Sequence, residues 1–199
     1  MFRNPKHFVD KHRIMMAYGE KREEIDMALL NDVILAMIEY DRGDRLRINH
    51  FMKVYGYASL IARTEGVDER TQRIVDVAGV LHDIGIHPAE KKYGNCMGRY
   101  QEELGPAEAD ALLTPLGIAR DEIERVMWLI AHHHTYGGGD AAGENGYLLG
   151  ALDHQILVEA DFLVNLDEGK ADEAAILSAK RQIFRTETGL RLLNRLFGV

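Results

Sequence analysis

The stretch VLHDIG, residues 80–85, decides the fold, because a histidine and an aspartate follow an apolar run of helical spacing. The spacing predicts a helix over residues 69–84, which Gly85 and Pro88 close. The neighbours of Asp83 one turn away are apolar or glycine, and an unpaired carboxylate in such a setting costs several kcal/mol. We therefore expect either a divalent metal ion or a Lys or Arg from elsewhere in the chain to pair with it.

The same helical spacing extends along almost the whole chain, while strand-like alternation is nearly absent. The fold class we expect is therefore an all-α, multi-helix bundle. DRGD at 41–44 is predicted to be a turn, 89–100 a loop or short helix, and 137–146 a flexible connection. The remaining helices are predicted over residues 6–17, 22–40, 46–65, 106–114, 121–134, 151–167 and 171–197, the last broken near Thr186–Gly189.

Length and composition limit the class of protein. At 199 residues the chain fits one domain, 1–199, and its 24 Lys and Arg against 32 Asp and Glu give a net charge of −8. This acidic balance argues against a nucleic-acid polymer or an anionic membrane as partner. With a single cysteine, Cys96, and no apolar run long enough for a membrane span, we expect a cytoplasmic protein.

Two further residues place metal-binding side chains on apolar helix faces. His50 lies one turn from Leu46 and Val54, and Asp161 lies among apolar residues of a later helix. Helical bundles build metal sites from inward-facing side chains on separate helices. Mixed imidazole and carboxylate ligands suit Zn, Fe, Mn, Co or Ni, and the sequence does not choose among these metals.

At these residues the chain resembles the HD-domain superfamily of metal-dependent phosphohydrolases, whose pattern is H … HD … D with each element on its own helix. The resemblance covers about residues 45–167. It implies that His50, His82, Asp83 and Asp161 hold a divalent metal ion inside an all-α fold. We expect residues 1–40 and 171–199 to pack on this bundle or to form a homodimer contact.

Three consecutive histidines end the predicted helix 121–134. One interpretation is that they are favourable cations at the negative end of the helix dipole. The other comes from the resemblance: two-metal branches of the superfamily carry Ile-x-x-His-His, which selects His133 and His134 as ligands of a possible second ion, with Asp83 and Asp161. Those branches place another histidine near Glu102, which is predicted to be either a carboxylate ligand or a solvated acid. The Gly-Tyr-Pro signature of cyclic-dinucleotide phosphodiesterases is absent.

Cationic side chains follow the His–Asp pair. Lys91, Lys92 and Arg99 are predicted to bind phosphate oxygens of a substrate, with solvated loop charges as the alternative. His87 is interpreted as a loop histidine, with a proton shuttle or a metal ligand as the alternative.

The function implied by the resemblance is a metal-dependent phosphohydrolase that acts on a small phosphorylated substrate, a phosphomonoester or a nucleotide, through a metal-activated water. Asp83 is the predicted catalytic residue, a ligand that also orients this water. Two alternatives remain: a di-iron oxygenase on the same scaffold, and a non-catalytic module that senses nucleotides.

Overall fold

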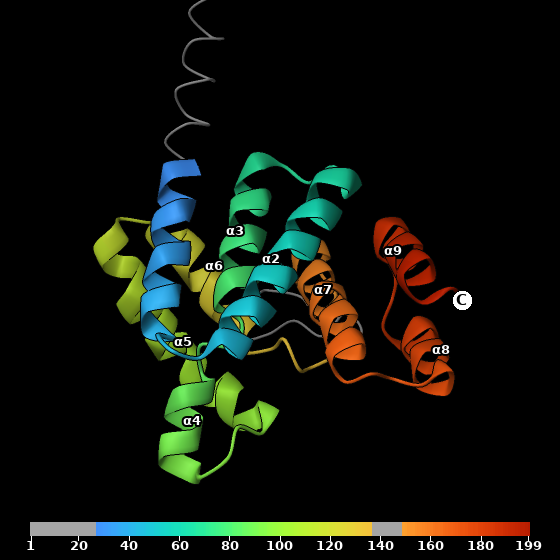
Figure 1. The fold of residues 1–199 in the computed structure, drawn as a ribbon. Coiled ribbons are helices and arrows are strands. Elements are labelled where there is room, and N and C mark those ends of the chain that lie inside the picture. Colours follow the sequence, from blue (N-terminus) through green and yellow to red (C-terminus); the bar gives the residue numbers. More distant parts are fainter. Residues whose placement is uncertain (1–26, 137–148) are drawn as a thin grey trace, which may run out of the picture.

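The computed structural model describes residues 27–136 and 149–199, and this part of the chain is helical with no strand (Figure 1). The all-α prediction is therefore confirmed. Residues 27–40 are helical, and they are followed by α2 (Arg45–Glu65), α3 (Glu69–Leu81), α4 (Ile86–Tyr93), α5 (Gly98–Leu113), a 3-10 turn (Thr114–Leu116), α6 (Arg120–Ile130), α7 (Leu152–Glu168), α8 (Glu173–Gln182) and α9 (Glu187–Phe197).

Local signals set the ends of α2, the helix that carries His50. The side chain of Asp44 accepts a hydrogen bond from the backbone N–H of Arg47, which caps the first turn. Gly66 ends the helix in the left-handed conformation, at φ 74°, where a side chain would be strained. The predicted helix over 46–65 and the predicted turn over 41–44 are both confirmed.

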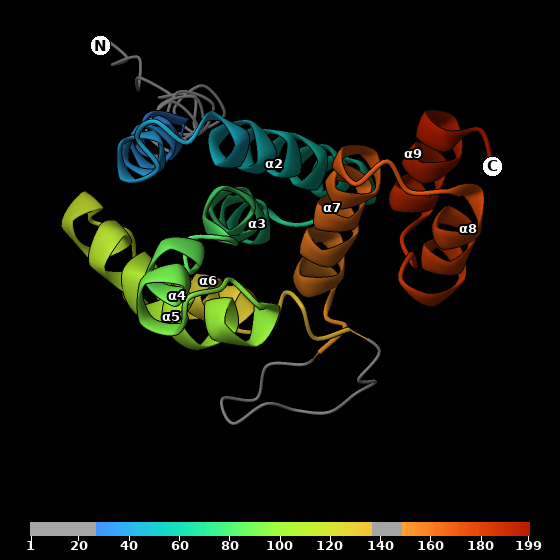
Figure 2. The same ribbon diagram turned by 60° about the horizontal axis from the view of Figure 1, so that its bottom comes forward.

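The central element is α3, which packs against α2, α6 and α7. Figure 2 shows it nearly end-on, with α2 and α7 on two sides and α5 and α6 on another. Every residue from Ile74 to Leu81 is buried, which explains why this segment reads as apolar almost throughout. The end of α3 therefore places the next two residues, His82 and Asp83, in the interior of the bundle.

Two helix boundaries differ from the sequence prediction around this centre. α3 ends at Leu81, three residues before the predicted end. Pro88 does not close a helix but lies in the first turn of α4, where a missing N–H costs nothing. Much of the segment 89–100 is accordingly helical.

The predicted start of a helix at 106 is wrong, because α5 begins at Gly98 and Pro106 lies inside it. Tertiary packing accounts for the difference. A Cβ added to Gly105 would lie 2.6 Å from Cγ2 of Ile130, so α5 approaches α6 closely at this glycine. The contact between helices outweighs the local preference of proline to begin one.

The C-terminal part follows the prediction, with α7 over 152–168 and a break between α8 and α9 near Thr186. α9 contacts α2 and α7 (Figures 1 and 2). The fully buried carboxylate of Glu159 on α7 accepts hydrogen bonds from the backbone N–H groups of Arg185 and Thr186. The predicted helix over 6–17 and the connection over 137–146 lie outside the described residues.

Among the described helices, none combines the length and the apolar composition that crossing a lipid bilayer would require.

Candidate metal centre

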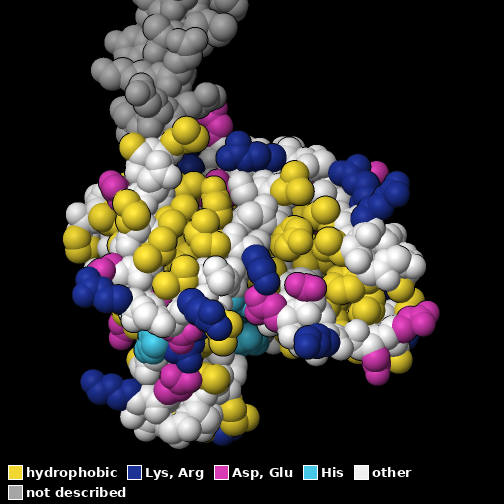
Figure 3. Space-filling model, viewed as in Figure 1, with side chains coloured by type: hydrophobic (Ala, Val, Ile, Leu, Met, Phe, Trp, Pro, Cys, Tyr) yellow, Lys and Arg dark blue, Asp and Glu magenta, His cyan; other side chains and the backbone are white. Residues whose placement is uncertain are grey.

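The His82–Asp83 pair lies just after α3, at the point where α2 and α7 meet it. His82 is fully buried and Asp161, on α7, is 4% exposed. The side chains of His50 and Asp83 are 12% and 20% exposed. Figure 3 shows histidine side chains in a recess between α2 and the α4 end of the molecule, with charged side chains around it. His82 and Asp161 are therefore buried, while His50 and Asp83 are in part accessible to solvent.

The structure brings these four side chains together. The Nε2 atoms of His50 and His82 lie 3.2 Å apart. Oδ1 of Asp161 lies 3.2 Å from the first and 3.5 Å from the second. Oδ2 of Asp83 lies 3.5 Å from each. Two ligand atoms at right angles, each about 2.1 Å from one ion, are about 3.0 Å apart. The ligand atoms of His50, His82 and Asp83 all lie within 4.8 Å of one another, which suits a shared cation, and Asp161 contacts the two histidines from outside that group.

The hydrogen bonds at Nδ1 of His82 and His50 determine the tautomers of the two rings. Nδ1–H of His82 donates to the backbone oxygen of Gly79 at 3.0 Å, and Nδ1–H of His50 donates to the carboxylate of Glu168 at 3.0 Å. With a proton on each Nδ1, a neutral ring presents a bare Nε2. Two lone pairs 3.2 Å apart repel each other, and a cation between them removes the repulsion. The residues present therefore fit a metal ion.

The electrostatics of the cluster favour charged groups despite its burial. Burial opposes ionisation of Asp83, but the neighbouring charge of His82 holds the pKa of Asp83 well below its usual value. Burial likewise opposes protonation of His50, yet hydrogen bonds with Asp161 and Glu168 and the charge of Asp83 raise the pKa of His50. Burial also opposes protonation of His82, but the carboxylates of Asp83 and Asp161 raise its pKa. Two carboxylates thus attract positive charge to one point, whether protons or a metal ion.

A second group of potential ligands shares Asp83. Nε2 of His133 lies 3.5 Å from Oδ1 of Asp83, and the ligand atoms of Asp83, His133 and His134 all lie within 4.8 Å of one another. Nδ1–H of His133 donates to the backbone oxygen of Ile130 at 2.7 Å, which leaves its Nε2 bare. Within the described residues, Nε2 of both His133 and His134 is buried without a hydrogen-bond partner. Burial and then the neighbouring His133 lower the pKa of His134 to about 4.

The first member of the histidine triplet has a different environment. His132 stacks on Trp128 with ring centroids 4.2 Å apart, and its Nδ1–H donates to the backbone oxygen of that residue. The triplet follows α6 in a turn instead of ending the helix, so the predicted helix over 121–134 stops at Ile130. Nδ1–H of His132 and Nδ1–H of His133 nevertheless donate to carbonyl oxygens of the last helical turn.

Glu102 lies beside the second group of potential ligands, but it belongs to neither the first group nor the second. Its Oε1 accepts hydrogen bonds from the backbone N–H of His134 at 3.1 Å and from the hydroxyl of Thr135 at 3.2 Å. Glu102 thus anchors the backbone that carries His134. Gly98 touches the same histidine from the other side: a Cβ there would lie 2.6 Å from its Cδ2.

The predicted phosphate-binding cations lie at the α4–α5 corner. Nζ of Lys92 donates to Glu103 and lies 4.7 Å from the ring centroid of Tyr93. The guanidinium of Arg99 lies 4.6 Å from the ring centroid of Tyr100. Lys91 is exposed on α4.

One part of the sequence argument for His50 is wrong. Val54 is fully buried, as expected, but Leu46 is 71% exposed. Leu46 lies in the first turn of α2, ahead of the buried part of that helix. The inward direction of His50 follows from Val54 alone.

Two charged residues near the centre escaped the sequence analysis. Glu168 contacts His50. Arg47 links the start of α2 to His87. Nε2 of His87 in turn lies 2.9 Å from Oδ1 of Asp41. Neither contact is visible in the sequence, because each joins residues at least 40 positions apart. His87 belongs to α4 and not to a loop.

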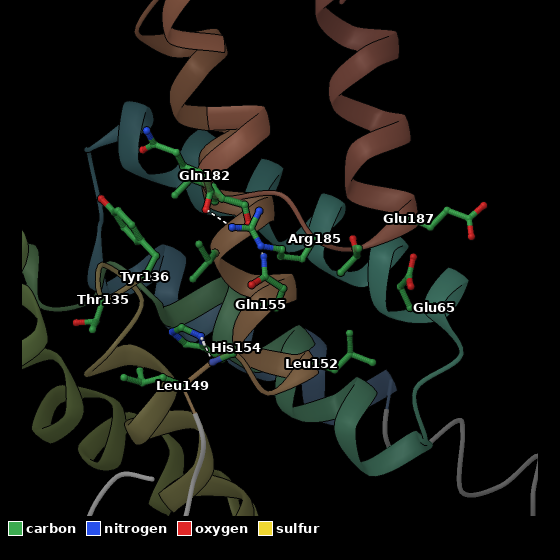
Figure 4. A pocket seen from close by; sticks show the side chains of 14 residues that line it. Glu65, Thr135, Tyr136, Leu149, Leu152, His154, Gln155, Gln182, Arg185 and Glu187 are labelled. Carbon is green, nitrogen blue, oxygen red and sulfur yellow. Dashed lines mark hydrogen bonds between the residues drawn. The ribbon is translucent and has the colours of Figure 1, made fainter. Parts of the chain in front are cut away.

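A cavity of about 590 Å³ lies between α7, the α8–α9 junction, the end of α2 and Thr135–Tyr136, which follow the histidine triplet (Figure 4). Gln155, Arg185, Glu187 and Glu65 line it. The Gln155 amide and the Arg185 guanidinium donate hydrogen bonds to backbone oxygens, so these polar groups stabilise the fold. No predicted site residue lines this cavity.

Comparison with known proteins completes this description. A family model described as HD domain matches residues 47–178, a segment that contains both groups of potential ligands. The crystal structure of a predicted HD superfamily hydrolase from an uncultured Thermotogales bacterium matches with a TM-score of 0.55 and 25% identity. The match covers 86% of this chain and 84% of that one. No curated protein matches.

Proposed function

The chain belongs to the HD-domain family, and from that membership we propose that it is a metal-dependent phosphohydrolase acting on a phosphomonoester or a nucleotide. The family match and the hydrolase among solved structures support the coarser assignment, a metal-dependent hydrolase. The phosphorylated substrate is our proposal.

The observation that carries the proposal is the pair of Nε2 atoms, on His50 and His82, that face each other at 3.2 Å between the carboxylates of Asp83 and Asp161. A metal-free cluster of this kind has to hold protons to avoid repulsion. A divalent ion satisfies all four side chains at once. When bound, it supplies a Lewis acid that lowers the pKa of water toward ~7 and so yields a nucleophile at neutral pH.

Asp83 is the residue to which we assign the orientation of that water. Its two oxygens face different groups, Oδ2 toward His50 and His82 and Oδ1 toward His133. It is also more open to solvent than His82 or Asp161. Because its pKa is low, Asp83 remains an acceptor that aligns a water O–H and does not retain the proton.

The α4–α5 corner is the proposed location for phosphate recognition. Gly98 lies against the His134 ring, so Arg99, the next residue, belongs to the segment that covers the second ligand group. Lys91 and Lys92 come from the helix that leads into the same corner. Cations at this edge compensate the charge of a substrate phosphate.

The proposal is tested with metal-stripped protein that is reloaded with Mn²⁺, Fe²⁺, Co²⁺, Ni²⁺ or Zn²⁺ and offered a panel of phosphomonoesters and nucleotides. Asp83→Asn should reduce turnover at least about 100-fold, because a catalytic metal contributes several kcal/mol to the transition state. Asp32→Asn, on the exposed face of the N-terminal helix, is the matched control and should be unchanged. Full turnover by metal-stripped Asp83→Asn protein would refute the mechanism, and binding without turnover across the panel would support the nucleotide-sensing alternative.

A di-iron oxygenase is the second candidate. The observation that favours it is the sharing of Asp83 between two adjacent groups of His and Asp ligands. Metal analysis and electron paramagnetic resonance of aerobically purified protein distinguish the two functions: a coupled di-iron signal with oxygen consumption would replace the hydrolase proposal.

A further inference from the structure

Nδ1 of His50, the ring nitrogen that points away from the cluster of predicted ligands, contacts a side chain from another helix. Nδ1 of His50 lies 3.0 Å from Oε2 of Glu168, the last residue of α7. The other carboxylate oxygen of Glu168 accepts a hydrogen bond from Nζ of Lys53 at 2.9 Å. Lys53, Glu168 and His50 thus form a chain of contacts that ends on the imidazole of a predicted metal ligand.

This arrangement differs from that of the other histidines. Nδ1 of His82 and Nδ1 of His133 bind backbone oxygens three residues earlier, Gly79 and Ile130. Those contacts are local, because each joins residues three positions apart in the chain. The orientation of His50 depends instead on α7 being docked against α2.

α7 contacts both nitrogens of His50. Asp161 and Glu168 are seven residues apart, about two helical turns, so they lie on the same face of α7. Side chains on a helix lean toward its N-terminus, which directs Glu168 back toward Asp161. Asp161 lies 3.2 Å from Nε2 and Glu168 lies 3.0 Å from Nδ1.

We propose that Glu168, held in place by Lys53, is a positioning residue that fixes the Nδ1–H tautomer of His50 and directs its bare Nε2 at the metal ion. The inference rests on the metal centre of the proposed function and extends it to a residue that does not itself touch the ion. A carboxylate behind a ligating histidine orients the ring and raises its basicity.

The test measures the affinity of metal-stripped protein for Co²⁺, by visible absorption and by competition with a chelator. Glu168→Ala should weaken Co²⁺ binding about 10–100-fold and alter the ligand-field bands. Glu168→Gln should weaken it less, because an amide oxygen still accepts from Nδ1–H. Asp167→Ala is the matched control: this neighbour is 73% exposed, also lies near Lys53, and should leave the affinity unchanged.

The melting temperature of the metal-free variants separates positioning from folding. Because Glu168 is partly exposed, Glu168→Ala should melt close to Asp167→Ala without metal, and the two should differ only with Co²⁺ present. Equal Co²⁺ affinities of Glu168→Ala and wild type, or an equal loss in Asp167→Ala, would overturn the inference while the metal centre stands. A wild-type chain that binds no Co²⁺ would refute the proposed function and this inference together.

Discussion

Gly98→Ala should displace His134 and impair the metal centre, although the substitution replaces no predicted ligand. A Cβ at Gly98 would lie 2.6 Å from Cδ2, 2.9 Å from Cγ and 3.3 Å from Cβ of His134. The contact therefore involves the base of the imidazole side chain, and rotation of the ring alone does not relieve it. The backbone of His134 is also held, through its N–H, by Glu102.

The size of the displacement follows from these distances. Ordinary contact begins at 3.4 Å, so the closest ring atom has to move by about 0.8 Å, which is 3.4 minus 2.6. A misplacement near 1 Å in an active site costs about 100-fold in rate. We expect Gly98→Ala to reduce turnover about 10–100-fold and to weaken the Asp83–His133–His134 group selectively, with the His50–His82–Asp83 group retained.

The assay compares metal content and turnover in Gly98→Ala with those in Gly56→Ala. Gly56 lies in the middle of α2, and a Cβ there meets nothing within 4 Å. The control therefore has the same chemical change without the collision. Equal metal content and equal turnover in the two variants would refute the reasoning that places His134 at the centre.

Two further predictions concern stability. His154 is buried as a neutral ring, its Nε2–H donating to the backbone oxygen of His132 and its Nδ1 accepting from the N–H of Gly150, and burial lowers its pKa. As the pH falls, His154 is therefore protonated in the unfolded chain before it is protonated in the folded one. The stability that the neutral, buried ring contributes is complete above about pH 6.5 and is lost as the pH falls below it. The difference in melting temperature between wild type and His154→Gln should therefore narrow from about pH 7.5 to about pH 5.5, and a constant difference would contradict the assignment. Gly189→Ala should destabilise the protein by about 2–3 kcal/mol in denaturant unfolding, because its Cβ would collide with the buried carboxylate of Glu159; an increase in stability, the usual result of Gly→Ala in a helix, would contradict the packing.

Helices with local end signals could be predicted from the sequence. Asp44 and Gly66 cap α2 with contacts to residues three or four positions away, so the helix boundaries follow from the sequence alone. α5 could not be predicted in this way. Its path past Pro106 depends on the approach of Gly105 to Ile130 on α6, a contact between residues 25 positions apart.

The candidate site shows the same division. His82, Asp83 and Asp161 were found because polar side chains on apolar helix faces are costly without a partner. Glu168 and Gly98 were missed because their significance lies in contacts with His50 and His134 that only the folded chain creates. Glu102 was expected to be either a carboxylate ligand or a solvated acid, and in the structure its carboxylate accepts a hydrogen bond from the backbone N–H of His134.

The most direct test of the shared cation is anomalous diffraction from crystals of the metal-loaded protein, with the metal identified by elemental analysis. We expect an anomalous peak between Nε2 of His50 and His82 and the carboxylates of Asp83 and Asp161. Metal-loaded crystals without a peak there, in which the same four side chains form only hydrogen-bonded ion pairs, would contradict it.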